Sequence, residues 1–395
     1  MNRKYRVGGS LISGQQRLLL RAALLKGDDA IRAWEKWAEN VNIDRIDVGS
    51  HRLLPALYHN LCLNDIAHPL MKKLKGIHRY YWYKNQIMFR NIGTLISVFE
   101  KAGIKTMVLK GAALNLLYYK NIELRPMNDF DVLVLQEQAL EAISLLSEIN
   151  FASVAHFKGN FTGGHAIPFV DAGGFRVDLH WHVISTGLEK DADNDFWKDS
   201  IPVQINDTST LALTPTDELL HVCAHRGISW SPSNLWWVPD ALIILDKSSA
   251  IDWQRFLLNV QKFHLILPMR ETLTYLHEEF NAPIPEKVLH TILRWRTTVG
   301  ERLVHKTLSS PKELRCPFWE LWQHFSNYKR SRGKSQFITL LWGFPDYLRL
   351  IWNINHLWQV PFYAFYKFLQ RMRRLLSAYK NKPLKLFVFQ KKYTE

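Results

Sequence analysis

Three aspartates in two short segments have the residue types and spacing of a divalent metal site. Asp129 and Asp131 flank Phe130, and the apolar run Val132–Leu135 that follows predicts a buried strand. Because side chains alternate along a strand, the two carboxylates share one face and Phe130 takes the other. Two carboxylates this close repel each other unless a proton or cation lies between them. Mg²⁺ is the expected cation, since it binds carboxylate oxygens and leaves positions for phosphates; the alternative is a solvated acidic strand end.

The third carboxylate, Asp178, belongs to a segment in which polar and apolar residues alternate. Asp178, His180 and His182 fall on one face of this predicted strand, and the apolar residues between them fall on the other. The run Ala166–Val170 comes before it, and the glycine-containing segment 171–174 between the two predicts a β-hairpin turn. We therefore expect a second strand to bring Asp178 to the first pair of carboxylates, with His182 in a structural role.

The elements that must position the first pair of aspartates lie directly upstream. The apolar run Thr106–Leu109 predicts a short buried strand, Lys110-Gly111 a turn, and 112–114 the start of a helix. A polar connector containing Arg125 then leads to the Asp-x-Asp strand. The order is therefore strand, turn, helix, connector and acidic strand.

This ordered set of motifs resembles a known family. A Lys-Gly turn, a helix, an Arg-x-x-x-Asp-x-Asp strand and a later Asp-Leu-His-Trp strand, all within 105–182, are similar to the uncharacterised nucleotidyltransferase family of the polymerase-β-like superfamily. In that superfamily a Gly-Gly or Gly-Ser turn precedes the helix, and a neighbouring strand supplies the third aspartate. Here Lys110-Gly111 stands where Gly-Ser is usual. The resemblance implies an α+β fold in which a mixed sheet with helices is flanked by N-terminal and C-terminal helical regions.

The resemblance also implies a reaction and roles for the three aspartates. It implies transfer of an NMP group from an NTP, such as ATP, to an acceptor hydroxyl with two Mg²⁺ ions. Asp129 and Asp131 would hold the ion that binds the triphosphate and would share the second ion with Asp178. Asp178 would also lie beside the acceptor hydroxyl and favour its deprotonation. All three are therefore expected as both catalytic residues and metal ligands.

Four further residues are candidates for substrate binding. The helix after Gly111 would direct its first amides at phosphate, and the glycine would let a phosphate approach the backbone closely. Lys110 and Arg125 are expected charge partners of the leaving pyrophosphate. Their alternatives are solvation at a strand end and, for Arg125, a salt bridge to Asp129. His180 would orient Asp178 or contact the acceptor.

The length of the chain, 395 residues, allows two or three domains. We expect an N-terminal helical region at 1–103, the catalytic core at 104–207, a helical domain at 208–300 and a basic, aromatic C-terminal region at 301–395. No apolar segment follows the basic start of the chain directly, so no signal peptide is expected. Three widely spaced cysteines favour a reduced cytoplasm over a disulfide framework.

The net charge of +15 is concentrated at the C-terminal end of the chain. Residues 294–395 contain 20 lysines and arginines and five aspartates and glutamates, whereas the rest contains 31 of each kind. The uncharged stretch Leu350–Tyr366 has 17 residues, which is too short and too polar for a convincing membrane span. Three interpretations stay open: core helices with a solvated basic face, an interfacial helix on anionic lipid at the inner face of the membrane, and nucleic-acid binding as the least favoured.

Two other motifs are weaker indications of function. His221 and His225 have the i, i+4 spacing used by zinc sites, but the Glu of His-Glu-x-x-His is missing and a structural role is favoured. The glycine-rich segment 158–165 lacks Walker spacing, so a mobile hairpin connection is favoured over a phosphate cradle.

Competing functions and the acceptor stay open at this point. The main alternatives to the enzyme are a nucleotide-binding protein with a degenerate active site and a membrane-surface or nucleic-acid adaptor built on the basic C-terminal region. The sequence does not identify the NTP. Proteins similar to this one are associated with bacterial surface-polysaccharide functions, which implies a saccharide or lipid-linked acceptor by analogy alone.

Overall fold

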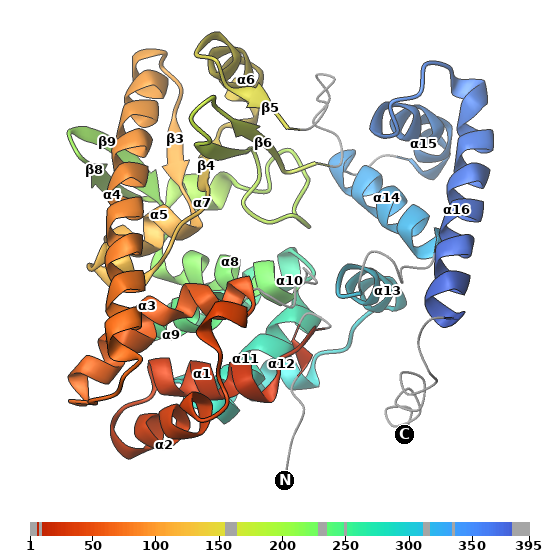
Figure 1. Ribbon diagram of the computed structural model, residues 1–395. Helices are drawn as coiled ribbons and strands as arrows, with labels where there is room; N and C mark the ends of the chain where they lie inside the picture. Colours follow the sequence, from red (N-terminus) through yellow and green to blue (C-terminus); the bar gives the residue numbers. More distant parts are fainter. Residues whose placement is uncertain are drawn as a thin grey trace.

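Within the described residues, seven strands form one mixed sheet (Figure 1). The computed structural model describes residues 6–7, 10–154, 164–227, 235–248, 251–310, 317–333 and 336–380. The strand order is β5 (Ala152–Ser153), β6 (Ala166–Val170), β7 (Arg176–His180), β4 (Phe130–Val134), β3 (Thr106–Val108), β9 (Thr208–Ala212) and β8 (Ile201–Ile205). β4 and β7 are parallel, as are β3 and β9, whereas the other pairs are antiparallel. The predicted α+β class with a mixed sheet flanked by helical regions is confirmed.

The two faces of this sheet differ in chemistry because the strands alternate apolar and polar residues. Phe130 and Val132 of β4 and Val177 and Leu179 of β7 are fully buried on one face, which is covered by α4 (Met71–Lys101) and α6 (Ala139–Glu148). Asp131 and the other acidic positions lie on the opposite face, towards α8 (Pro215–Gly227). In Figure 1, α4 runs along one side of the sheet and α8 lies below it.

Local signals in the sequence explain where several elements begin and end. The hairpin of β6 and β7 is confirmed, and Gly174 in its turn has φ +81°, a left-handed conformation that glycine adopts easily. α4 ends at Lys101, and Gly103 follows with φ +70°. α8 begins at Pro215, and the Thr214 hydroxyl accepts a hydrogen bond from the Asp217 amide at 3.3 Å. The glycine-rich segment 158–165 lies outside the described residues except for its last two positions.

Helices from both ends of the first 294 residues share one hydrophobic core. The salt bridge between Arg17 and Glu279 joins them, with Nε–Oε2 and Nη2–Oε1 distances of 2.5 and 2.6 Å. The boundary expected at 207 falls between the paired strands β8 and β9, so the sheet extends to Ala212. The helices that contribute to this core include, besides α8, α1 (Gly14–Leu24), α2 (Gly27–Ala38), α3 (Val48–Leu63), α9 (Trp237–Lys247), α10 (Trp253–Lys262), α11 (Ile266–Phe280) and α12 (Glu286–Arg294).

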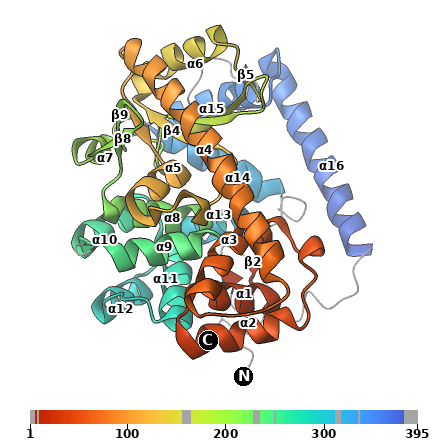
Figure 2. The same cartoon turned by 60° about the vertical axis from the view of Figure 1, so that its left-hand side comes forward.

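The basic C-terminal region forms a separate layer of helices beside this core. Its elements are α13 (Val299–Leu308), α14 (Pro317–Ser331), α15 (Phe337–Ile351) and α16 (Val360–Lys380). They enclose a small apolar cluster that includes Tyr328, Leu340 and Tyr347. Both views place α16 at the outer edge of the molecule (Figures 1 and 2). The stretch 350–366 is divided between α15 and α16, and no helix within the described residues is long and apolar enough to cross a bilayer.

Candidate functional site

Two parallel strands bring two of the three predicted aspartates together. β4 and β7 are neighbours in the sheet, and Asp131 lies opposite Asp178 in their register. Directly opposed side chains on one face are about 5 Å apart at their Cβ atoms, so the two carboxylates face the same space. Asp129 precedes β4 and lines the same cavity of about 400 Å³, which we call the carboxylate cavity. All three aspartates therefore border one cavity.

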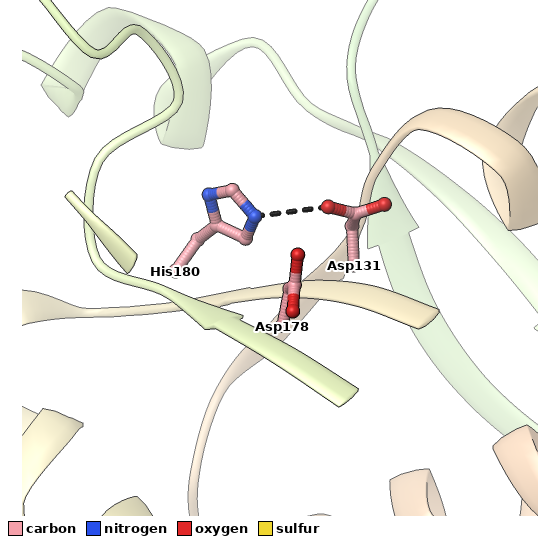
Figure 3. Close-up of side chains that lie close together, drawn as sticks. All are labelled: Asp131, Asp178 and His180. Atoms are coloured by element: carbon pink, nitrogen blue, oxygen red, sulfur yellow. Dashed lines mark hydrogen bonds and ion pairs between the residues drawn. The ribbon is translucent and has the colours of Figure 1, made fainter. Parts of the chain in front are cut away.

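His180 lies closer to Asp131 than the sequence predicted. It is two residues beyond Asp178 on β7, and its Nε2 lies 3.0 Å from Asp131 Oδ1 (Figure 3). Asp131, Asp178 and His180 each offer a ligand atom, and these atoms lie within 4.8 Å of one another. Among the described residues, this is the one close group suited to a metal ion, and Asp129 is outside it. The hydrogen bond found for His180 is thus with Asp131, and the predicted role of His180 beside Asp178 or the acceptor stays a prediction.

Lys110 holds Asp131 in its ionised form. The Lys110 Nζ atom lies 2.5 Å from Asp131 Oδ1, the same oxygen that His180 contacts. Burial acts to raise the pKa of Asp131, but the charge of Lys110 and the bond to His180 outweigh it, so that this pKa is well below its ordinary value. Burial likewise acts to lower the pKa of Lys110, and Asp131 reverses this effect and raises it. The pair is therefore charged at neutral pH.

The other two carboxylates differ from Asp131 in their electrostatics. Reduced hydration raises the pKa of Asp178, and the charges of Asp131 and Asp129 raise it further. The pKa of Asp129 is raised by reduced hydration and then by Asp131, against the effects of Lys110 and nearby arginines. Like charges thus accumulate on one side of the cavity, an arrangement that a bound cation would relieve. The oxygen donors of the three aspartates fit Mg²⁺.

Lys110, in the turn between β3 and the helix that follows it, has an unusual backbone conformation. Lys110 has φ +47°, the left-handed region that glycine enters most easily, and it begins the five-residue helix α5 (Lys110–Leu114). A non-glycine residue in such a conformation costs on the order of 1–3 kcal/mol, which the surrounding structure must offset. The ion pair with Asp131 is one interaction that holds Lys110 there. The lysine thus occupies the first position of the turn, where the superfamily that the sequence resembles has glycine.

Side chains of the connector before β4 pack directly against the α-carbon of Gly111. A Cβ atom placed on Gly111 would lie 2.5 Å from Arg125 Nη1 and 3.0 Å from Met127 Cγ. The space beside its α-carbon that the sequence suggested for a phosphate is therefore filled by the connector that leads to β4.

We expect Gly111→Ala to lower the free energy of unfolding by about 1–3 kcal/mol, because overpacking displaces Arg125 and Met127. Urea denaturation of the purified variant measures this loss, with Gly14→Ala as the control because no atom lies within 4 Å of its added Cβ. Wild-type stability in Gly111→Ala would show that the connector moves without cost.

Arg125 has a different salt-bridge partner from the one considered from the sequence. Its guanidinium donates to Asp240 on α9, with Nη2–Oδ2 and Nε–Oδ1 distances of 3.0 and 3.3 Å. Tyr119 also donates to Asp240 Oδ1 at 2.9 Å, and the Arg125 guanidinium lies 5.7 Å from the centre of the Trp236 ring. The sequence suggested a salt bridge of Arg125 to Asp129 as an alternative, but Arg125 pairs with Asp240 instead. Its side chain still lines the carboxylate cavity.

Arg52 of α3 is a candidate site residue that sequence reasoning missed. It lines the carboxylate cavity with Asp129, donates to the Pro126 carbonyl at 2.9 Å, and lies over the Trp236 ring at 5.9 Å. Burial lowers the pKa of Arg52, and the positive charge of Arg125 lowers it further. Two crowded guanidinium groups favour an anion between them. No motif surrounds Arg52, so only the contact of α3 with the connector before β4 reveals it.

A second cavity adjoins the first on the other side of Lys110. It measures about 270 Å³ and includes the side chains of His165, His180, His221 and His225; we call it the histidine cavity. Lys110, His221 and His225 line both cavities. Burial lowers the pKa of His165 and of His221 well below the ordinary value, so both rings are neutral at physiological pH. Among the described residues, His221 and His225 belong to no group of three metal ligands.

The C-terminal region contributes to the wall of the histidine cavity. Val304 and Leu308 of α13 and Gln323 and Asn327 of α14 line it. His182 lies outside it, and its Nδ1 lies 2.6 Å from Asp193 Oδ2. α13 and α14 therefore lie beside His180 and Lys110, which none of the three interpretations of the C-terminal region predicted.

Comparison with known protein families identifies one match. The model of a family described as uncharacterised nucleotidyltransferase matches residues 48–281. The matched segment contains the whole seven-stranded sheet and all the predicted site residues of both strands. No functionally curated protein is significantly similar to the chain.

Two solved structures show weaker likeness. The lincosamide antibiotic adenylyltransferase LnuA, solved with lincomycin bound, is 13% identical, covers 39% of this chain and 96% of its own, and has a TM-score of 0.30. An antigenic nucleotidyltransferase-like protein from Paracoccidioides brasiliensis is 16% identical, covers 51% of this chain and 96% of its own, and has a TM-score of 0.31.

Proposed function

Since the chain belongs to the uncharacterised nucleotidyltransferase family, we propose that it transfers an NMP group from an NTP to an acceptor hydroxyl. The observation that carries this proposal is the register of β4 and β7, which sets Asp131 opposite Asp178 at the border of a cavity lined by basic residues. Carboxylates beside cationic side chains suit a triphosphate and its metal counter-ions.

In the proposed reaction the acceptor oxygen attacks the α-phosphorus of the NTP. A new P–O bond forms, the bond from this phosphorus to the bridging oxygen breaks, and pyrophosphate leaves. Asp178 accepts the proton of the acceptor hydroxyl, a role that its raised pKa favours. Arg52, Lys110 and Arg125 surround the triphosphate and offset the charge of the leaving pyrophosphate.

We assign the metal-binding role to Asp129, Asp131 and Asp178. Bound there, two Mg²⁺ ions would stabilise the charge on the attacking and leaving oxygens. Asp131 is kept ionised by Lys110 and is oriented by His180, and a cation that binds its carboxylate would compete with the Lys110 ammonium group. Asp129 is the more exposed carboxylate and would reach the triphosphate from the open side.

A nucleotide-binding protein without turnover is a second candidate. The ion pair of Lys110 with Asp131 favours it, because the lysine neutralises the carboxylate that should hold a cation. The two candidates differ in one measurable respect, since only the enzyme releases pyrophosphate.

The proposal is tested by labelling. Purified protein is incubated with Mg²⁺, a cell extract and each of the four α-labelled NTPs in turn. We expect one NTP to pass its label to an acceptor, with release of pyrophosphate in equal amount. Binding of an NTP by calorimetry without any labelled product, in extracts from several growth conditions, would favour the second candidate.

A further inference from the structure

The C-terminal region exposes large apolar side chains on α15, on α16 and on the short 3-10 helix Leu357–Gln359 between them. Trp342 of α15 is 83% exposed and Phe362 of α16 is 70% exposed, and Phe337, Ile338, Trp358 and Phe365 are each more than 60% exposed. Several large apolar side chains exposed on neighbouring helices are a feature of surfaces that bind a partner or a membrane. Aromatic rings are typical of the headgroup level of a bilayer.

A groove between α14 and α16 combines this apolar character with positive charge. It measures about 460 Å³, and Phe318, Leu321 and Phe365 are among its apolar residues. Among the described residues that line it, Lys367, Arg371 and Arg374 are cationic and none is acidic. The groove therefore matches an amphiphile with an apolar chain and a negatively charged group.

Two further cavities lie between the groove and the proposed active site, and each shares lining residues with the next. Phe318 and Leu321 line both the groove and a larger cavity of about 950 Å³ beside α15. Val304 lines this larger cavity and the histidine cavity, which in turn shares Lys110 with the carboxylate cavity. Cavities that share lining residues thus follow one another from the outer helices to the carboxylate cavity.

We propose that the groove between α14 and α16 binds the apolar chain of an anionic membrane lipid, and that the acceptor of the reaction is lipid-linked. The phosphate of the lipid lies beside Lys367, Arg371 and Arg374, and the exposed aromatic residues of α15 and α16 enter the headgroup layer. The statement about the acceptor rests on the proposed nucleotidyl transfer, whereas lipid binding does not.

Charge and side-chain type favour lipid over other occupants. Two copies of this chain would bring together two regions of strong positive charge, which repel each other. A nucleic acid would be attracted by the positive charge, and its bases would stack on the aromatic rings. It would make no comparable contact with exposed aliphatic side chains such as Ile338. An anionic bilayer satisfies both the cations and the aliphatic residues.

Lipid binding is tested by co-sedimentation of the full-length protein with vesicles in the absence of NTP. We expect binding to phosphatidylglycerol vesicles, weak binding to phosphatidylcholine vesicles and a decrease as salt rises. Bromine-labelled acyl chains should quench part of the tryptophan fluorescence. Failure to bind phosphatidylglycerol vesicles at low ionic strength would overturn the proposal, as would a concentration-dependent dimer whose formation blocks binding.

Two neighbouring arginines separate groove binding from general attraction. Arg374 lines the groove, whereas Arg373 on the same helix is exposed outside it. Arg374→Gln should weaken vesicle binding about fivefold or more relative to the wild type, because a cation at an anionic surface contributes about 1 kcal/mol. The loss should be larger than in Arg373→Gln, because Arg374 also contacts the lipid in the groove. Ala364→Phe narrows the groove without changing charge and should weaken binding too. Equal losses in both arginine variants, with no loss in Ala364→Phe, would contradict a specific groove.

The acceptor class is tested by extracting the labelled product with organic solvent. We expect the labelled product to enter the organic phase and to form more slowly in Ala364→Phe. A labelled product that stays entirely in the aqueous phase, formed with release of pyrophosphate, would overturn the acceptor assignment. Absence of any labelled product would instead count against the proposed transferase reaction, and vesicle binding would still decide the role of the groove.

Discussion

Asp178→Asn is expected to lower nucleotidyl transfer by about 10²–10⁴-fold, because the amide cannot accept the proton of the acceptor hydroxyl. The substitution keeps the shape of the side chain and removes its charge. Asp178 is only partly buried on β7, so the fold should tolerate the change. Loss of the charge also removes one ligand from the group formed with Asp131 and His180.

The measurement is the initial rate of label transfer at saturating NTP and Mg²⁺, together with the dissociation constant of the NTP. Asp207→Asn is the matched control, since it removes an exposed carboxylate from the turn between β8 and β9, away from the site. Asp129→Asn should weaken Mg²⁺-dependent NTP binding more than it changes proton transfer. Unchanged transfer by Asp178→Asn would show that the reaction does not depend on this carboxylate.

The carboxylate pair was predictable because its signals are local. The i, i+2 spacing of Asp129 and Asp131 and the alternation around Asp178 define faces of strands without reference to the rest of the chain. The hairpin turn then places β7 beside β6. Neither strand's own sequence predicts that β4 pairs with β7, and this expectation came from the family resemblance.

The partners of the basic residues were not predictable, because they come from distant parts of the chain. Arg125 pairs with Asp240, which is 115 residues away, and Arg52 reaches the site from a helix with no motif. In both cases burial beside another charged group decides the contact, and sequence spacing carries no information about it. Composition indicated the basic C-terminal region, but not that α13 and α14 line the histidine cavity beside His180.

Glu218 is a buried carboxylate that the sequence did not single out. It lies on α8 with no exposed surface, and neither of its oxygens has a hydrogen-bond partner among the described residues. Burial raises the pKa of Glu218 to about 8, and the negative charge of Asp240 contributes to this rise. At neutral pH the folded protein therefore holds this side chain in its protonated form.

This shift makes stability depend on pH in a defined direction. The folded pKa of Glu218 is near 8 and its ordinary value is 4.5, so between these pH values the unfolded chain has lost a proton that the folded protein keeps. Because the folded state binds more protons, the contribution of Glu218 to stability falls as pH rises through this window, and it levels off above the folded pKa. Each pKa unit corresponds to about 1.4 kcal/mol, which gives about 3 kcal/mol near pH 7.

Glu218→Gln is therefore expected to raise the free energy of unfolding by about 3 kcal/mol near pH 7 and to flatten its decline towards higher pH, because glutamine cannot ionise. Urea denaturation across a pH series measures both effects. The control is Glu279→Gln, in which a buried carboxylate bonded to Arg17 is neutralised and stability should fall instead. A wild-type pH profile in Glu218→Gln would mean that the Glu218 carboxylate is ionised in the folded protein, and that the cations Arg125 and Lys110 outweigh the cost of its burial.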